Sequence, residues 1–302
     1  MSTTSPATPV RAGHDADKPS AIPLRGWREI FTRVRCEVDH DNVSVIAAGC
    51  AFYGLMALVP TLASLAAIYG LVANLADVQR HVAAFGSMVP REARELALSL
   101  LSDIVHRSPT ALSFGAVSGI VLALWSASRG TSALLQAIAI AYHQPSKRGW
   151  LRDNAVSLLF TLVGILFAVV AIGLVALVPA ALALVGLELP GVAVLSWLRW
   201  PVLFVSFCAA LSILYRYALD REPPRWRWVS WGAAVATVLW LAGSVVFSAY
   251  VAKVANYGKT YGPLGAAVVL LMWLYLTAYV VVLGAEINAG IELQASPVDR
   301  RA

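Results

Sequence analysis

The chain has 302 residues, of which 59% are hydrophobic and only 13% charged, and its mean hydropathy is +0.71. A water-soluble globular domain carries about 25% charged residues, so this composition excludes one. The charged residues lie in short segments between long apolar runs, which predicts an integral membrane protein.

The N-terminal segment precedes every apolar run. Its first residues are rich in Ser, Thr, Pro and Ala, so we assign residues 1–25 to a disordered cytoplasmic tail. No apolar run begins before Val43, and we therefore expect no cleaved signal peptide.

Residues 26–42 form the next segment, in which apolar side chains recur at helical spacing. This pattern predicts an amphipathic helix that lies on the cytoplasmic surface of the membrane. The apolar positions are Trp27, Ile30, Phe31, Val34 and Val38.

Continuous apolar runs then predict six transmembrane helices, each long enough to cross a hydrocarbon core about 30 Å thick. Their approximate ranges are 43–72, 111–131, 155–185, 196–217, 229–252 and 263–288. The runs lack the alternation of membrane strands, so the predicted fold class is all-α. Pro60 predicts a kink or break near Val59. We assign 43–292 to this transmembrane domain and 293–302 to a cytoplasmic tail.

The only long loop on the outer side covers residues 73–110. Pro90 is suited to open a helix there, and the residues after it give that helix a broad leucine-rich face. We expect a helical periplasmic loop that packs on the membrane domain or on a partner protein.

Polar residues follow one stripe of the second predicted transmembrane helix and of its continuation. Ser118, Trp125, Arg129, Ser132, Gln136 and His143 are separated by 7, 4, 3, 4 and 7 residues. At about 100° per residue these spacings place them on one helix face. The stripe predicts one of two arrangements. Either its residues line a polar path, or they share no function. In the second case Arg129 extends toward the lipid headgroups and the serines hydrogen-bond to their own helix.

A carboxylate closes the sixth predicted helix. Glu286 follows a long uncharged run, and counting residues places it near the inner boundary, at the level of Arg129. A charge at that depth is better paired than isolated, so we predict an inner polar cluster of these two residues with Asn288. Gly284 and Gly290 are expected to allow close helix approach. The cluster is either structural or part of a substrate path.

A third group of residues lies between the fifth and sixth predicted helices. Tyr250, Tyr257 and Tyr261 accompany Gly and Pro residues there, which predicts a periplasmic aromatic turn. The alternative is an ordinary outer aromatic belt.

The sequence offers no catalytic pattern. The three cysteines lack a C-x-x-C spacing and the five histidines are scattered, so we expect neither a metal site nor a cofactor. No phosphate-binding loop or nucleophile motif is present, and no pattern indicates nucleic-acid binding, so we expect no enzyme.

Four stretches carry a family resemblance. AAGCAFYGLMALVPTLASL begins at residue 47, LWSASRGTSALLQAIAIAYH at 124, FSAYVAKVANYGKTYGPLGA at 247 and WLYLTAYVVVLGAEINA at 273. In this order they resemble the YihY/virulence factor BrkB family of bacterial inner-membrane proteins. The resemblance implies a six-helix fold and an inner-membrane location. Some members carry an old ribonuclease label, and transport of lipids or lipopolysaccharide precursors has been suggested for relatives.

Two functions follow as hypotheses. The first is transport of a lipid or another amphipathic anion through a cavity lined by the Arg129 stripe and Glu286, with membrane lipids as partners. The second is a membrane anchor that docks an envelope-assembly or lipid-transfer factor through residues 73–110. The ribonuclease hypothesis is disfavoured, because the residues for RNA binding and cleavage are missing.

The distribution of basic residues predicts the orientation. With both termini in the cytoplasm, sixteen Lys and Arg lie inside and seven outside, as the positive-inside rule requires. Reporter fusions at Lys147 and Ala302 should therefore report the cytoplasm, and a fusion at Arg91 the periplasm. A periplasmic reporter signal from Ala302 would contradict the six-helix topology.

Overall fold

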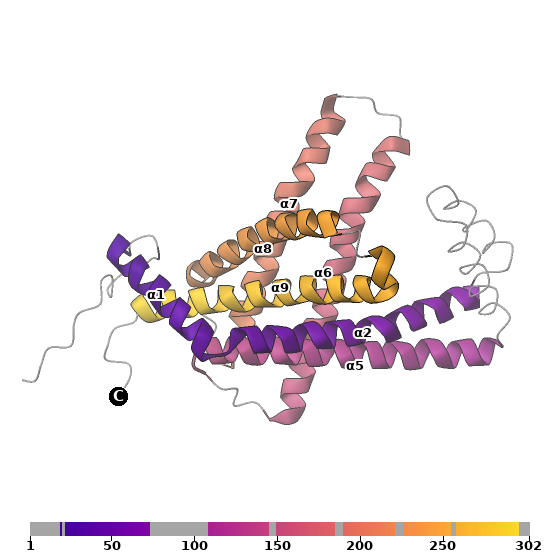
Figure 1. Cartoon of the computed structure of the whole chain (residues 1–302), viewed down its shortest axis with the longest axis horizontal. Coiled ribbons are helices and arrows are strands. Elements are labelled where there is room, and N and C mark those ends of the chain that lie inside the picture. The colour runs from indigo at the N-terminus through magenta and orange to yellow at the C-terminus, as the bar shows by residue number, and fades with distance from the viewer. Residues whose placement is uncertain are drawn as a thin grey trace, which may run out of the picture. The chain divides into compact units, whose positions relative to one another are not determined.

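The computed structural model describes Pro19 and residues 22–72, 108–144, 149–184, 190–220, 226–254 and 258–295, and all regular structure in these ranges is helical. The fold is that of an all-α membrane protein (Figure 1). Its helices are α1 (Leu24–His40), α2 (Val43–Val72), α5 (Pro109–Ala141), α6 (Trp150–Leu184), α7 (Pro190–Tyr217), α8 (Trp226–Val254) and α9 (Gly258–Ala295).

Five helices of the described part are long and apolar enough to cross a membrane. These spans are Val43–Ile68, Thr110–Ala141, Trp150–Ala171, Val229–Val251 and Ala267–Ala295. They correspond to five of the six predicted crossings. The remaining one, predicted at 196–217, is helical in α7, where the apolar described part is the shorter segment Phe204–Tyr217. The loop predicted over 73–110 lies outside the described residues except for its last three.

Two details of the predicted helices need correction. Helix α2 runs through Pro60 without a break, so of the predicted kink or break near Val59 only the kink stays a prediction. The hydroxyl of the neighbouring Thr61 donates to the Ala57 carbonyl oxygen (2.6 Å). Helix α9 begins at Gly258, before the predicted start at 263, so the expected turn is shorter. A proline near the start of a helix removes few backbone hydrogen bonds, which explains why Pro263 does not set the boundary.

The chain divides into two compact units, each of which is described by itself. Unit 1 comprises Met1–Ala51 and Thr131–Ala302, and unit 2 comprises Phe52–Gly130.

In unit 1, helix α1 packs on the C-terminal part of α9 (Figure 1). Ile30 and Val34 of α1 are buried together with Ile291 of α9, and a Cβ added to Gly290 would lie 3.2 Å from Val34. The amphipathic spacing therefore predicted the helix correctly, but much of its apolar face is covered by protein. Phe31, at the edge of this apolar face, stays 72% exposed.

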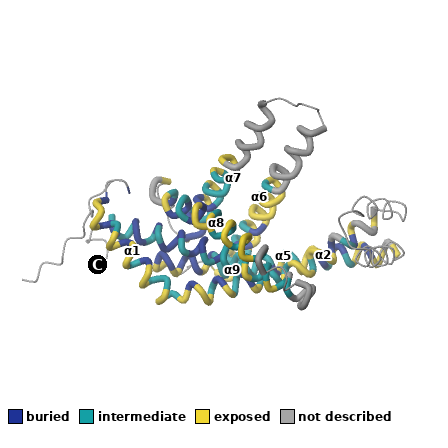
Figure 2. Tube along the Cα trace, turned by 45° about the horizontal axis from the view of Figure 1, so that its top comes forward, coloured by how far each residue is buried: buried dark blue, intermediate teal, exposed yellow. Residues whose placement is uncertain are grey.

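The core of unit 1 lies where α7, α8 and α9 meet, and Figure 2 shows the buried residues gathered around α1, α8 and α9. A Cβ added to Gly232 of α8 would collide with the Gly284 carbonyl oxygen of α9, and one added to Gly284 would collide with the Tyr215 hydroxyl. The expected close approach at Gly284 is thus confirmed. The Tyr215 hydroxyl donates to the Val281 carbonyl oxygen (2.6 Å) and joins α7 to the same crossing.

A row of aromatic rings links four helices of unit 1. Phe207 of α7 stacks on Trp240 of α8 with ring centroids 4.7 Å apart. Phe167 of α6 and Trp273 of α9 extend the row at 6.3 and 6.0 Å. The Trp240 indole N–H donates to the Thr277 hydroxyl (3.1 Å), so the ring system is also fixed by a hydrogen bond.

In unit 2, α2 and α5 pack against each other through small residues. A Cβ added to Gly119 would lie 2.9 Å from that of Ser64, and the Ser64 hydroxyl donates to the Ala116 carbonyl oxygen (3.1 Å). The Ser126 hydroxyl likewise donates to the Tyr53 carbonyl oxygen (3.3 Å). Small and hydroxyl-bearing residues at the contact are typical of membrane helices, whose association depends on close packing and interhelical hydrogen bonds.

The close contact of Gly232 with Gly284, which we call the glycine crossing, predicts how a substitution there changes stability. Gly284→Ala should lower the free energy of unfolding by about 1–3 kcal/mol, because backbone and ring atoms occupy the space of the new methyl group. Gly164→Ala in α6 is the matched control: its Cβ would meet no atom within 4 Å, so better helix propensity should leave stability unchanged or raise it by up to about 1 kcal/mol. Thermal unfolding in detergent measures both, and equal melting temperatures for the two variants would contradict the packing argument.

Candidate functional site

Asn288 joins α8 to α9 at the glycine crossing. Its side chain is buried and makes two hydrogen bonds: Oδ1 accepts from the Gly232 N–H (2.7 Å), and Nδ2 donates to the Val229 carbonyl oxygen (2.9 Å). Both ends of the amide are thus satisfied within the protein, as burial requires. Among the residues of the predicted polar cluster, Asn288 therefore holds α8 and α9 together.

Glu286 lies two residues before Asn288 on α9, and its carboxyl group is not fully hydrogen-bonded. The residue is 2% exposed, and its Oε1 has no hydrogen-bond partner among the described residues. The carboxylates of Asp41 and Glu37 are the charged groups that act on it. A buried carboxyl group is stabilised either by a proton or by a partner that offsets the desolvation of its charge.

A cavity of about 230 Å³ lies between α5, α6 and the end of α7. Ser132 and Gln136, both from the predicted stripe, line it, and the Gln136 amide donates to the Ser132 hydroxyl (3.3 Å). The other polar lining residues are Gln144, Asp153, Ser157 and Asp220. The apolar lining residues are Leu135, Ala139, Ile140, Val156, Ala218 and Leu219. The cavity is therefore amphipathic, and its described lining contains two carboxylates and no Lys or Arg.

The predicted stripe is divided between the units. Ser118, Trp125 and Arg129 belong to unit 2, whereas Ser132, Gln136 and His143 belong to unit 1. Ser118 donates to the Gly115 carbonyl oxygen (3.3 Å), as expected if the serines only hydrogen-bond to their own helix. The Arg129 guanidinium lies over the ring of Trp125, 5.6 Å from its centroid. Because Arg129 and Glu286 lie in different units, their pairing stays a prediction.

The predicted aromatic turn is described only in part. Tyr250 lies on α8, where it is 49% exposed and its ring is 6.4 Å from that of Phe247. Tyr261 falls within α9 rather than in a turn. Tyr257 lies outside the described residues, so the expected grouping of the three rings stays a prediction.

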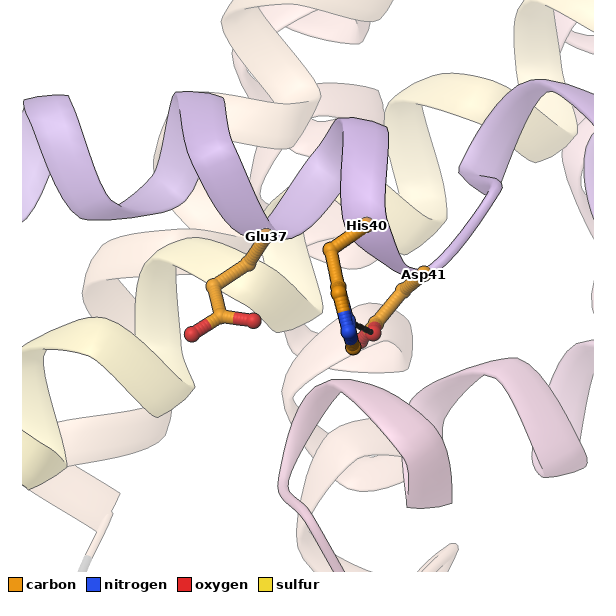
Figure 3. Close-up of side chains that lie close together, drawn as sticks. All are labelled: Glu37, His40 and Asp41. Atoms are coloured by element: carbon orange, nitrogen blue, oxygen red, sulfur yellow. Dashed lines mark hydrogen bonds and ion pairs between the residues drawn. The ribbon is translucent and has the colours of Figure 1, made fainter.

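A group of side chains that the sequence pattern did not indicate lies at the end of α1 (Figure 3). One ligand-type atom from each of Glu37, His40 and Asp41 lies within 4.8 Å of the others. The His40 Nδ1 lies 2.9 Å from an Asp41 carboxylate oxygen. This hydrogen bond, reinforced by the charges of Asp41 and Glu37, raises the pKa of the His40 imidazole. In the described part of the chain, this is the only trio arranged to hold a metal ion.

A sequence signal for this trio exists. Glu37, His40 and Asp41 have the spacing i, i+3 and i+4, which places them on one face of a helix, and Glu-x-x-His is a spacing known from metal sites in helix bundles. The trio contains only one histidine, so a pattern of clustered histidines does not reveal it. The approach of His143, whose Nε2 is 3.7 Å from a Glu37 carboxylate oxygen, has no sequence signal, because 106 residues (143 minus 37) separate the two.

Comparison with known proteins gives a consistent result. The family described as Virulence factor BrkB matches residues 34–302. A ribonuclease-like protein of Bacillus subtilis named YfkH is 30% identical over 271 residues, which cover 87% of this chain and 93% of that protein. A UPF0761 membrane protein of Tolumonas auensis is 23% identical over 280 residues, or 87% of this chain and 82% of that protein. No solved structure matches.

The Arg129–Glu286 pair is testable by a double-mutant cycle. If the two residues pair, Arg129→Ala or Glu286→Ala alone should lower the free energy of unfolding by about 3–5 kcal/mol, because each strands a charge at depth. The double variant should then recover part of this loss, which thermal unfolding in detergent measures. Strictly additive effects would reject the pair.

Proposed function

The chain belongs to the virulence factor BrkB family, and from this premise we propose that it transports a lipid or a related amphipathic molecule by way of the cavity between α5, α6 and α7. The observation that carries the proposal is the mixed lining of this cavity. Its lining contains serine, glutamine and aspartate side chains together with leucine, isoleucine, valine and alanine side chains. A molecule with a polar group and an apolar tail suits such a lining.

The size of the cavity limits what it holds. Its volume of about 230 Å³ is below the range of roughly 300–1,000 Å³ that encloses a drug-sized ligand. We therefore propose that the cavity takes the polar headgroup, while the tail lies along the exposed apolar face of α6. That face includes Leu159, Val163 and Leu166, which are 59%, 49% and 64% exposed.

The charge of the cavity bears on the headgroup. Asp153 and Asp220 place two carboxylates in the lining, and none of the described lining residues is Lys or Arg. Carboxylates repel phosphate and carboxylate groups and attract ammonium groups. Because it is rich in hydrogen-bond acceptors and its described residues include no Lys or Arg, the lining favours a headgroup with several hydrogen-bond donors over the amphipathic anion that the sequence suggested.

Ribonuclease activity is not what we propose, although the Bacillus subtilis relative bears a ribonuclease-like name. A substrate with one phosphate per nucleotide requires a basic groove, whereas the described cavity carries carboxylates. We propose instead a non-enzymatic protein of the bacterial inner membrane, with both termini in the cytoplasm.

The alternative of a membrane anchor depends on residues 73–110 as a docking segment. Of this segment the structure describes only residues 108–110, which lead into α5. We propose transport first because the described cavity has a suitable chemistry.

Blocking the cavity tests the proposal. In liposomes containing the purified full chain, lipid labelled on its headgroup should cross between leaflets faster than in protein-free liposomes. Ser132→Trp should return the rate close to the protein-free value, because the indole fills the cavity. Val246→Trp is the control, because Val246 is 69% exposed on α8 and outside both the cavity lining and α6, and it should retain the rate.

Each result of this assay decides something. No transfer by the unmodified chain, with labelled lipids of cationic, zwitterionic and anionic headgroups all tried, would overturn transport. Equal rates for the two tryptophan variants would overturn the cavity as the route. Faster transfer of anionic than of zwitterionic lipid would contradict the headgroup preference.

A further inference from the structure

We propose that the end of α1 forms a binding site for a divalent transition-metal ion such as Zn²⁺ or Mn²⁺, with Glu37, His40, Asp41 and His143 as ligands and Glu286 as a buried carboxylate behind them. The site lies in unit 1 and shares no residue with the cavity lining. It thus goes beyond the transport proposal and stands or falls independently of it.

The first argument is geometric. The trio of ligand atoms within 4.8 Å comes from one helix end, and Figure 3 shows all three side chains on the same side of it. A cation with bonds of about 2.1 Å holds ligand atoms up to roughly 4.2 Å apart, so small side-chain rotations suffice to close the site. The turn between α1 and α2 is also fixed. The Asn42 backbone has a left-handed φ of 52°, and its side-chain amide donates to the His40 carbonyl oxygen (3.1 Å).

The second argument is electrostatic. Glu37 and Asp41 lie at the C-terminal end of α1, where the helix dipole is negative and a cation is favoured. Helix α5 also ends here, since His143 approaches Glu37 from just beyond Ala141. None of the trio, His143 or Glu286 forms an ion pair with a Lys or Arg among the described residues. Two negative helix ends and several carboxylates thus face one another without a basic side chain.

The third argument is the buried carboxyl group of Glu286. Although it comes from α9, it is 2% exposed, its Oε1 lacks a partner, and Asp41 and Glu37 are the charges that act on it. The Asp41 side chain is itself only 8% exposed, and its Oδ2 also lacks a partner. A bound cation is one way to satisfy buried carboxylate oxygens that lack hydrogen-bond donors.

The fourth argument concerns the conformation of His143. Helix α5 ends in a Schellman motif, with the His143 N–H donating to the Ile140 carbonyl oxygen (2.7 Å) and the Gln144 N–H to that of Ala139 (2.9 Å). This motif usually has glycine at its left-handed position, yet His143 adopts a φ of 53° there. Its Nδ1 lies 3.3 Å from the Ala141 carbonyl oxygen, so a proton on Nδ1 leaves the Nε2 lone pair toward Glu37. Metal-binding histidines are commonly oriented in this way.

The ligand chemistry selects the class of ion. Imidazole nitrogen suits Zn²⁺ and other transition metals, and carboxylate oxygen is shared with Mn²⁺, whereas Mg²⁺ prefers oxygen ligands alone. A bound ion would join α1, α5 and α9. It would therefore stabilise the docking of α1 as well as occupy the site.

Titration of the full chain in detergent tests the proposal. After removal of metal with a chelator, calorimetry with Zn²⁺ should show saturable binding of about one ion per chain and a raised melting temperature. His40→Ala and Asp41→Asn should each weaken binding about tenfold or more. Asp39→Asn is the matched control, because Asp39 is exposed two residues away and its change removes the same charge; it should alter affinity by less than about threefold.

His143→Gly supplies a variant that folds by design. Glycine suits the left-handed position, so the metal-free melting temperature should stay the same or rise while Zn²⁺ affinity falls. Glu286→Gln should also lower the affinity. The proposal is overturned by lack of saturable Zn²⁺ binding, by equal weakening in Asp39→Asn and Asp41→Asn, or by Mg²⁺ binding as tightly as Zn²⁺.

Discussion

Three helices of unit 1 approach so closely at one crossing that no side chain fits between two of them. Gly232 and Gly284 bring the backbones of α8 and α9 together, and Tyr215 of α7 closes the contact. With lipid outside, polar atoms at such a crossing must bond within the protein. Asn288 and the Tyr215 hydroxyl do so, and in this way they fix the depth at which α9 presents Glu286. The position of every polar group near the end of α9 depends on this crossing.

The Glu286 Oε1 has no hydrogen-bond partner among the described residues, and two partners are proposed for it. One is Arg129, which the sequence predicts at the same depth but which belongs to unit 2. The other is a cation held at the end of α1, where Asp41 and Glu37 act on Glu286 within one unit. One carboxylate is neutralised by one of these partners, so evidence for a cation bound at the end of α1 would count against the pairing with Arg129.

Much of the fold was predictable, because hydrophobic length and helical spacing are local properties. Helix α2 has the bounds predicted from its apolar run, and the spacing of Ile30 and Val34 predicted α1. The packing of α1 on α9 was not predictable, since the spacing shows an apolar face but not whether lipid or protein contacts it. At the site, Ser132 and Gln136 were found from their stripe, whereas Asp153 and Asp220 come from other helices. The contact of His143 with Glu37 depends on tertiary packing that no local pattern encodes.

The docking of α1 on α9 has a consequence for the order of assembly. The Gln294 amide donates to a Glu29 carboxylate oxygen (2.7 Å) across 265 residues of sequence. Helix α1 is among the first segments to leave the ribosome, and its protein partner is among the last. During synthesis its apolar face has only the membrane surface to rest on, which is where an amphipathic helix binds by itself. The same residues can thus meet the membrane surface first and α9 later, because the contact between α1 and α9 forms only after α9 has been made.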